Sequence, residues 1–543
     1  MFSGANDAVR QRRPSISRLE VTALTVSSSG RNTVALAAAC LASLMFGLEI
    51  SSVPTILPTL QKVLHASFQQ LQWIMNAYTI AVTTVLMATG TLADRYGRKR
   101  VFVISIAVFG LASLICGLAQ DALVLIVSRF LQGMSGGAML ICQVAVLSHQ
   151  FQEGPARARA FAAWGIIFGI GLGFGPIVGA AIVAVSGWPW VFLVHGLIAI
   201  ATIALAVTGV QESRDPDAKH LDVAGIATLS TSVFCVAFYI TQGPDFGFMS
   251  PTGLAIAATA ILSFVAFVLA ETRSARPMFD FSVLRIRAFS GALVGSAGMN
   301  FSFWPFMIYL PILFRALGYD NVEAGLALLA YTLPTLVVPP FGERILLRFG
   351  GGIAIPAGLF TIGLGFMLMN AGSGAEHVNW LTLGPGCLLA GIGLGLTNTP
   401  VTNVTTGSVP SARAGMASGI DMSARMISLA INIALMGFIL VAGIAARLRE
   451  ALPGGLDAGH LQDLAQQIAG GAIRTADFPG PETVMHDALI HGFRLVMLYG
   501  GISVWVLALA SFVISGQGYQ GHAQQRRSRG GGEACAATRS SPS

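Results

Sequence analysis

Apolar stretches long enough to cross a lipid bilayer recur along almost the entire chain. A transmembrane helix needs about 20 consecutive, mainly apolar residues. Because lipid offers the backbone no hydrogen-bond partners, such a segment must be helical. The sequence therefore predicts an all-α polytopic membrane protein with fourteen transmembrane helices. Their expected starts are Thr33, Trp73, Val101, Ala122, Ala160, Trp190, Asp222, Pro251, Phe289, Glu323, Gly352, Leu381, Gly415 and His491.

Composition excludes a soluble protein and several kinds of partner. Of the 543 residues, 54% are hydrophobic and 10% are charged, whereas soluble domains carry about 25% charged residues. The net charge of +7 comes from basic residues scattered in short loops, without the basic–aromatic interleaving typical of nucleic-acid-binding proteins. The six cysteines are far apart and form no CxxC pair. Neither a disulfide framework nor a metal site is therefore predicted.

Basic residues predict which side of the membrane each loop occupies. Lys and Arg collect in cytoplasmic loops, and most of the 32 in this chain fall on one side if both termini are placed there. The loops expected on the other side hold Lys62, Arg315, Arg447, Arg449 and Arg474. The first apolar run is too long for a cleaved signal peptide. We therefore expect a multi-pass protein of the cell (inner or plasma) membrane, with both termini in the cytoplasm.

Glu49 is the only charged residue of the first long apolar run, Thr33 to Leu57. A carboxylate in hydrocarbon costs roughly 2.5–3.5 kcal/mol or more, so it requires a function or a partner. Pro54 and Pro58 follow closely and predict a broken, partly polar helix. Such a helix lines a cavity more readily than it faces lipid. The pattern indicates a proton carrier in a coupled transporter.

The loop between the second and third spans combines glycines with charges. Its sequence, GTLADRYGRKR from residue 90 to residue 100, lets two helices turn sharply and pack closely at the glycines. Its acid can bind an arginine or a helix N-terminus across an interface. A loop that is basic only because it faces the cytoplasm would explain neither the acid nor the glycine spacing. The residues that carry this pattern are Gly90, Asp94, Arg95, Gly97 and Arg98.

Arg129 lies in the fourth span, with Gly133 one turn further along. A guanidinium group stays charged, so it can repel a proton or favour the charged form of a nearby acid. Arg129 also lies about two turns of 3.6 residues from the expected outer end of the span. Its side chain could therefore reach outward to the membrane interface instead.

The fifth span is rich in glycine and contains a proline. Gly165, Gly169 and Gly173 follow at four-residue spacing, which lets helices approach closely. Pro176 removes a backbone donor and bends the helix. Plain helix packing would explain the glycines but not the proline. The motif comprises Gly165, Gly169, Gly173, Gly175, Pro176 and Gly179.

These three motifs resemble those of the major facilitator superfamily. Residues 48–58, LEISSVPTILP, resemble the first-helix motif of its fourteen-helix drug:proton antiporter branch, a group of multidrug efflux transporters. The resemblance implies proton coupling through Glu49 and Arg129, a latch at the 90–100 loop and a hinge in the fifth span. Three positions depart from the branch pattern. Glu49 replaces its usual Asp, and Pro54 and His195 each replace an Asn.

The second half of the chain repeats the first after two inserted spans, which predicts a major facilitator fold of two six-helix bundles plus two inserted central helices. Pro311 matches Pro58, but the copy of the Arg129 motif at Cys387–Gly393 has no arginine. Proton chemistry is therefore expected in the first half. Residues 458–473 are expected to form a short amphipathic helix. The expected regions are a cytoplasmic tail (1–32), the first bundle (33–211), the inserted helices with cytoplasmic linkers (212–272), the second bundle (273–515) with a long outer loop (446–487), and a disordered cytoplasmic tail (516–543).

Aromatic and polar residues within the spans are candidates for a substrate cavity. His195 is either a titrating group near neutral pH or a packing histidine. Asp421 and Arg425 lie four residues apart and share a helix face. They either neutralise each other, which makes their burial tolerable, or Asp421 is a second carboxylate for cations or protons. The full set is Trp73, Tyr78, His195, Trp304, Asp421 and Arg425.

The predicted function is proton-coupled export of hydrophobic or cationic small molecules by alternating access, with no cofactor besides the proton gradient. The alternative is export of an endogenous metabolite, siderophore or peptide-like compound by the same fold. A primary pump or membrane enzyme is excluded because the sequence has neither a GxxxxGKS/T phosphate-binding loop nor an HExxH motif. The expected partners are the substrate, protons and lipid. A monomer is expected, and no periplasmic adaptor is indicated.

Overall fold

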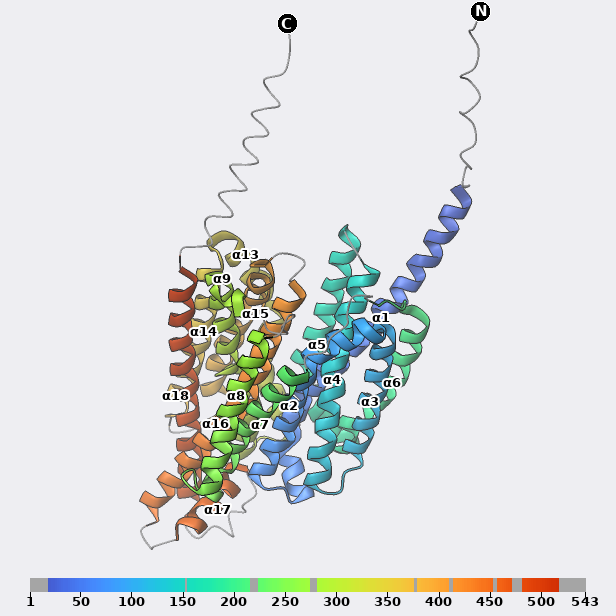
Figure 1. Cartoon of the computed structure of the whole chain (residues 1–543). Coiled ribbons are helices and arrows are strands. Elements are labelled where there is room, and N and C mark those ends of the chain that lie inside the picture. The colour runs from blue at the N-terminus through green and yellow to red at the C-terminus, as the bar shows by residue number, and fades with distance from the viewer. Residues whose placement is uncertain are drawn as a thin grey trace, which may run out of the picture.

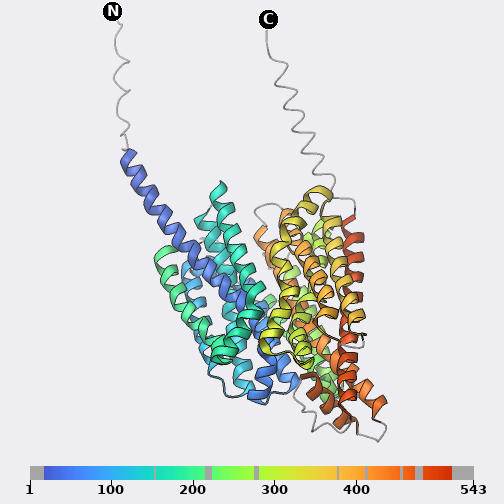
Figure 2. The same ribbon diagram turned by 180° about the vertical axis from the view of Figure 1, so that it is seen from behind.

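Two bundles of helices stand side by side, with a helix pair against their flank (Figures 1 and 2). The first bundle contains α1 (Arg18–Leu64), α2 (Phe68–Tyr96), α3 (Arg98–Gly117), α4 (Ala122–Gln150), α5 (Gly154–Ser186) and α6 (Pro189–Gly209). The computed structural model describes residues 18–151, 154–214, 223–273, 281–375, 378–409, 414–452, 457–470 and 481–516.

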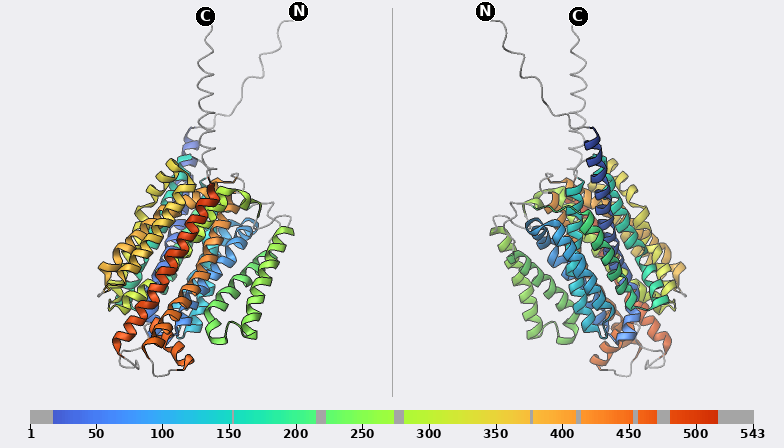
Figure 3. Two further views of the ribbon diagram at one scale, coloured as in Figure 1. Left: turned by 90° about the vertical axis from the view of Figure 1, so that its left-hand side faces the viewer. Right: turned by 90° about the vertical axis from the view of Figure 1, so that its right-hand side faces the viewer.

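The second bundle follows the inserted pair α7 (Val223–Phe246) and α8 (Pro251–Arg273). The pair packs on α2 of the first bundle and on α16 of the second, and Figure 3 shows it at the edge of the molecule. The remaining elements are the 3-10 turn η1 (Phe281–Arg285), α9 (Arg287–Asn300), α10 (Phe303–Ala316), α11 (Asn321–Thr332), α12 (Pro334–Val337), α13 (Pro339–Phe349), α14 (Gly351–Gly372), α15 (Trp380–Gly407), α16 (Ala414–Ala451), α17 (Ala458–Gly470) and α18 (Glu482–Ser515).

The helices are compatible with the fourteen expected spans. Within the described residues, twelve helical segments are long and apolar enough to cross a membrane, and a bent pair formed by α11–α12 and α13 would be a thirteenth. The 29-residue α2 is similarly long but more polar at its start. Each expected start lies in or beside a helix, although Asp222 itself lies outside the described residues.

Three boundaries differ from the sequence expectation. α1 begins at Arg18 rather than near Thr33, while the outer parts of the two expected tails, 1–17 and 517–543, lie outside the described residues. The ninth span is broken between α9 and α10, where Ser302 leaves the helical region with φ −138° and ψ −72°. The tenth span bends by 44° before α13, because prolines at its breaks cannot donate backbone hydrogen bonds.

The amphipathic helix expected in the long loop is confirmed as α17. Its apolar residues Leu461, Ala465 and Ile468 are buried, at the spacing of one helix face. We call the end of the molecule that carries α17 the α17 end. The opposite end, which carries the start of α1 and the close of α18, is the termini end (Figure 1).

The two bundles meet along a seam in the half of the molecule nearer α17. There α5 packs on α11, α2 on α16, and α1 on α10. The Thr332 hydroxyl of α11 donates to the Gly173 carbonyl of α5 over 2.8 Å. A large apolar core crosses this seam, whereas a second core lies almost entirely within the first bundle. Towards the termini end the ribbons of the two bundles diverge (Figures 1 and 2).

Candidate functional site

Glu49 and Arg129 form an ion pair in the interior of the first bundle. Both side chains are 0% exposed, and Arg129 Nη1 donates to Glu49 Oε1. The arginine therefore points into the bundle, and the outward-reaching alternative is wrong. A buried ion pair offsets the cost of desolvation only if additional hydrogen bonds satisfy its remaining polar atoms.

Groups on α2 and α4 supply such bonds to two of the three guanidinium nitrogens of Arg129, while its Nη2 has no hydrogen bond among the described residues. Its Nε donates to the Ile74 carbonyl over 3.2 Å, and its Nη1 donates to Gln132 Oε1 over 2.6 Å. Gln132 in turn donates to Ser113 Oγ over 2.8 Å. The guanidinium carbon lies 4.2 Å from the centre of the Tyr78 ring, within the range of a cation–π interaction. Gln132 was not predicted, although its position one turn after Arg129 was a usable signal.

His195 of α6 completes the environment of Glu49. Its Nδ1 lies 2.9 Å from the Val191 carbonyl and 3.4 Å from Glu49 Oε2. Because a carbonyl oxygen can only accept, Nδ1 carries a proton. Nε2 has no hydrogen-bond partner among the residues that the structure describes. The predicted cavity residue His195 thus contacts the candidate proton carrier instead.

A cavity lies beside this cluster, between α1 and α2 of the first bundle and α10 and α16 of the second. Its walls are almost wholly apolar, as is typical of sites for small organic molecules. Three of its residues are methionines, whose flexible side chains adapt to ligands of different shape. Its walls are Ile50, Pro54, Met75, Tyr78, Thr79, Trp304, Met307, Ile308, Met426, Leu429 and Ile433.

Two residues of the cavity wall adjoin the ion pair. Ile50 of the wall directly follows Glu49, and Tyr78 of the wall lies against Arg129. Tyr78 and Trp304, which were predicted to line a substrate cavity, both line this cavity, and their contact with a substrate stays a prediction. Trp73 is not, since it packs against Phe234 of α7 at 5.7 Å between ring centres. Successive residues of a helix are rotated by about 100°, so Trp73 and Tyr78 project in different directions.

Asp421 and Arg425 form the expected pair within α16, 3.0 Å apart. Arg425 Nη2 also donates to Thr402 Oγ1 of α15 over 3.1 Å. Neither residue lines the cavity, although Met426 on the next position of α16 does. The geometry therefore favours the self-neutralising interpretation. Asp421 nevertheless keeps one buried oxygen, Oδ1, without a hydrogen bond in the described part of the chain.

The loop between α2 and α3 packs against the end of α6. Gly97 adopts φ +112°, and a Cβ added there would lie 2.6 Å from Glu212 Oε1. Glu212 Oε1 accepts from the Lys99 amide over 3.1 Å, and the Arg98 amide donates to the Ser213 carbonyl over 3.0 Å. Arg95 is exposed above the ring of Tyr96. The side-chain positions of Gly90 and Asp94 lie outside the described residues, so the latch stays a prediction.

The glycine motif of α5 contacts neighbouring helices on two faces of the helix. On one, Gly171 and Gly175 lie against α1, where Ser51 Oγ donates to the Gly171 carbonyl over 3.0 Å. Gly179 lies against Ser52 of the same helix. On the other face, an added Cβ at Gly169 would lie 3.0 Å from Leu336 of the second bundle.

The expected close approach at four-residue spacing does not occur at every glycine. Gly165 and Gly173 have open space where a Cβ would stand. Close packing on α1 uses Gly171, Gly175 and Gly179, of which only the first is outside the predicted motif. Pro176 faces the second bundle, because its carbonyl oxygen is 3.2 Å from a Cβ built on Gly325. The motif thus contacts both bundles, but its hinge role stays a prediction.

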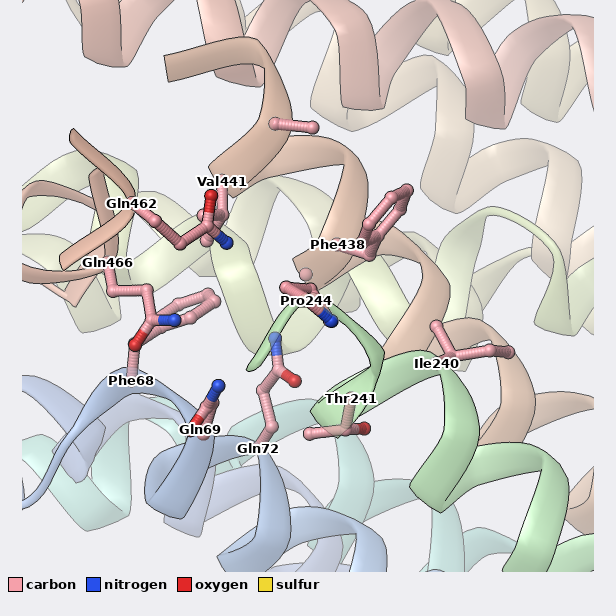
Figure 4. Close-up of a pocket in the computed structure, with 12 residues that line it drawn as sticks. Phe68, Gln69, Gln72, Ile240, Thr241, Pro244, Phe438, Val441, Gln462 and Gln466 are labelled. Atoms are coloured by element: carbon pink, nitrogen blue, oxygen red, sulfur yellow. The ribbon is translucent and has the colours of Figure 1, made fainter. Parts of the chain in front are cut away.

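A second cavity, at the α17 end, has amide side chains in its walls (Figure 4). Gln69 and Gln72 of α2 face Gln462 and Gln466 of α17 across it, with α7 and Phe438 of α16 as further walls (Figure 4). Gln69 Nε2 donates to Asp245 Oδ2 of α7 over 2.6 Å. This cavity was not predicted, because its residues come from four separate segments.

Comparisons with known proteins agree with this architecture. Residues 39–432 match the Major Facilitator Superfamily. The chain is 29% identical over 481 residues to the multidrug resistance protein Stp of Mycobacterium tuberculosis, covering 86% of this chain and 89% of that protein. It is 28% identical over 509 residues to the tetracenomycin C resistance and export protein of Streptomyces glaucescens, covering 89% and 92%.

A solved structure has the same fold at low identity. The D-xylose–proton symporter superimposes with a TM-score of 0.56 at 14% identity, over 81% of this chain and 96% of that one. The predicted fold class is thus confirmed. The chain belongs to the Major Facilitator Superfamily.

Proposed function

We propose that this protein exports hydrophobic or cationic small molecules across the cell membrane in exchange for protons, by alternating access. The names of relatives, a multidrug resistance protein and an antibiotic export protein, support export of such compounds. The observation that carries the proposal is the buried Glu49–Arg129 pair, which adjoins an apolar cavity between the two bundles.

Glu49 is the proton carrier in this proposal. Its carboxylate is held in the bundle by the fixed charge of Arg129. Protonation removes that charge and weakens the ion pair, leaving the guanidinium without a counterion. Because Ile50 and Tyr78 belong to the cavity wall, the resulting shift reaches the substrate directly. Proton uptake and substrate release are thereby coupled with no cofactor besides the proton gradient.

The cavity composition supports amphiphilic substrates. Its walls are almost wholly apolar, with Tyr78 and Thr79 as polar groups. An apolar wall stabilises a hydrophobic ring or chain, while the face of Trp304 can contact a cation. Asp421 is the second candidate carboxylate for cationic substrates. If Asp421→Asn leaves transport of every substrate unchanged, that role is excluded.

In the proposed orientation the termini end faces the cytoplasm and the α17 end faces the outside. The basic loop residues at Arg95 and Arg98 support this assignment. The seam near α17 then closes the outer side, and the loop between α2 and α3 contacts Glu212 and Ser213 of the first bundle. This arrangement corresponds to a transporter closed to the outside. We propose that it acts as a monomer.

A second candidate function is export of an endogenous metabolite, siderophore or peptide-like compound. Two departures from the drug-antiporter pattern favour it, because both lie at the site. Pro54 forms part of the cavity wall, and His195 contacts Glu49. Competition assays with natural compounds against a transported dye distinguish it from drug export.

Substrate-driven proton release from energised everted vesicles tests the main proposal. A pH-gradient dye is followed while lipophilic cations are added, for wild type, Glu49→Gln and a control. The control is Glu271→Gln, because Glu271 of α8 is also a buried carboxylate but lies outside the site.

The expected result is a compound that collapses the gradient with wild type and Glu271→Gln but not with Glu49→Gln. No response of wild type across the panel contradicts cation export and favours the metabolite alternative. A normal response of Glu49→Gln shows that another residue couples the proton, and Asp421 is then tested.

A further inference from the structure

A third cavity lies on the seam at the α17 end, separate from the central cavity. Its volume is about 210 Å³. Its walls come from α1 of the first bundle and from α10, α17 and α18 on the other side of the seam. They are Pro58, Lys62, Ile312, Arg315, Ala316, Ile468, Gly470, Met485, His486 and Leu489.

Basic residues from both sides of the seam surround this cavity. Lys62 belongs to α1, Arg315 to α10 and His486 to α18, and among the described residues that line the cavity there is no Asp or Glu. A concave site lined by one sign of charge focuses the electrostatic potential and concentrates counter-ions. Arg315 is held in place, because its Nη1 donates to the Tyr319 carbonyl over 2.8 Å.

Acidic residues of the same end have other partners. Asp487, next to His486, lies 3.7 Å from Arg447, and Glu450 lies 3.2 Å from the same arginine. Asp320 and Glu323 cap the start of α11 by exchanging hydrogen bonds with each other's backbone. These carboxylates contact Arg447 or the backbone of α11 and do not line the cavity.

The rest of the cavity wall is apolar. Ile312, Ile468 and Leu489 are buried hydrophobic residues at this site. A small hydrated anion would use the basic groups but not these walls. An anion that also carries an apolar portion would use both.

We propose that this cavity binds a phosphate group, as the headgroup of an anionic phospholipid or as a soluble phosphate, and that this ligand holds the outer side closed. Alternating access requires α1 to separate from α10 at this end. A phosphate between Lys62 and Arg315 contacts both bundles only while they are together. A ligand with greater affinity for one conformation shifts the population towards it, so the ligand regulates transport from outside the substrate cavity.

The experiment uses the purified full-length chain in nanodiscs under three conditions. The first nanodisc contains phosphatidylcholine alone, and the second contains phosphatidylcholine with phosphatidylglycerol. The third condition adds inorganic phosphate to the buffer of the phosphatidylcholine nanodisc, with chloride at equal ionic strength as its control. The thermal unfolding midpoint is followed as each ligand is titrated. Binding to the folded state raises this midpoint.

Two charge variants locate the effect. Lys62 is exposed, so the Lys62→Gln variant should fold normally. It should weaken the apparent affinity for the phosphate ligand about fivefold, because one basic residue near an anionic surface contributes ~1 kcal/mol. Arg447→Gln removes an arginine at the same end but outside the cavity, so it should leave the affinity unchanged. Lys62→Arg should retain binding.

A rise with phosphatidylglycerol alone supports a lipid ligand, and a rise with inorganic phosphate in phosphatidylcholine supports a soluble one. In either case the ligand should speed disulfide formation in the double variant Ala180→Cys with Gly325→Cys, because these two positions face each other across the seam. No rise with either ligand overturns the proposal. An equal loss of affinity in Lys62→Gln and Arg447→Gln also overturns it, because that shows a general charge effect.

Discussion

At the scale of single residues, the proposed proton site is built around the hydrogen bonds and the ring contact of Arg129. Contacts from Ile74, Gln132 and Tyr78 hold its guanidinium in one orientation. Each member of the pair still has one buried atom without a hydrogen bond in the described part of the chain, Nη2 of Arg129 and Oε2 of Glu49. The Glu49 Oε2 atom lies 3.4 Å from His195 Nδ1. In the proposed roles, Arg129 remains fixed by its contacts while Glu49 exchanges its proton.

The ion pair should show strong coupling between its two members. Glu49→Met or Arg129→Met alone leaves the other charge buried without its partner, which costs about 3–5 kcal/mol. The double variant replaces the pair with apolar side chains and should cost far less than the sum of the two. Thermal unfolding of the purified protein measures all three. Additive losses would show that the two residues do not interact in the folded protein.

The two tryptophans predicted for the cavity should behave differently on substitution. Trp304 lines the cavity, so Trp304→Ala should raise the KM for an apolar substrate by about tenfold through lost aromatic contact. Trp73 packs on Phe234 and Phe238 of α7, so Trp73→Ala should lower the unfolding midpoint and change KM little. Transport kinetics and thermal unfolding of both variants decide this. A larger KM effect for Trp73→Ala would contradict the assignment.

At the scale of helices, α5 shows why a glycine pattern alone does not identify its contacts. Three glycines at four-residue spacing predict one close helix interface. In the structure the interface with α1 is formed by Gly171, Gly175 and Gly179, whereas Gly165 has free space beside it. Which face of a helix packs depends on its neighbours, and these are not visible in the local sequence.

Alanine substitutions in α5 should distinguish Gly171 from Gly165. At Gly171 the new Cβ would lie 2.9 Å from the Leu44 carbonyl oxygen, so Gly171→Ala forces α1 and α5 apart and should cost about 1–3 kcal/mol. Gly165→Ala meets no atom within 4 Å and should be neutral or stabilising by up to ~1 kcal/mol, because alanine favours the helix. The unfolding midpoints of the two variants measure the difference, and equal losses would contradict it.

Helix positions were more predictable than helix breaks. Hydropathy placed the spans and the amphipathic spacing placed α17, because both signals are local. The break at Ser302 was not predicted, whereas the break predicted at Pro54 and Pro58 is wrong, because α1 passes through both prolines as one helix. The number of prolines in a segment therefore does not decide whether its helix is continuous. Tertiary packing determines whether the backbone carbonyl groups that a proline leaves without a donor find other partners.

At the scale of the whole molecule, the candidate site was predictable in its members but not in its contacts. Glu49 and Arg129 each stood out as a charge within an apolar span, yet they are 80 residues apart in sequence. His195 stood out as a departure from the branch pattern, and only the packing of α6 on α1 places it beside Glu49. The seam cavities depend on both bundles together, so no single segment indicates them.

The final prediction concerns the closed seam on which alternating access depends. A Cβ built on Gly325 of α11 lies 3.0 Å from the Ala180 Cβ of α5, so small backbone shifts bring cysteines there within disulfide range. In a background with the native cysteines replaced by serine, Ala180→Cys with Gly325→Cys should form a disulfide on oxidation. Transport should fall to background and recover on reduction.

The reason for this loss is that the cross-link holds the α17 end closed while leaving Glu49 and the central cavity untouched. Ala180→Cys alone, oxidised in the same way, should keep its activity and so controls for damage by the oxidant. Substrate binding should persist in the cross-linked protein, because the cavity walls are those of the closed state. Normal transport after complete cross-linking would mean that α5 and α11 do not separate at this point, and the opening would then have to occur elsewhere along the seam.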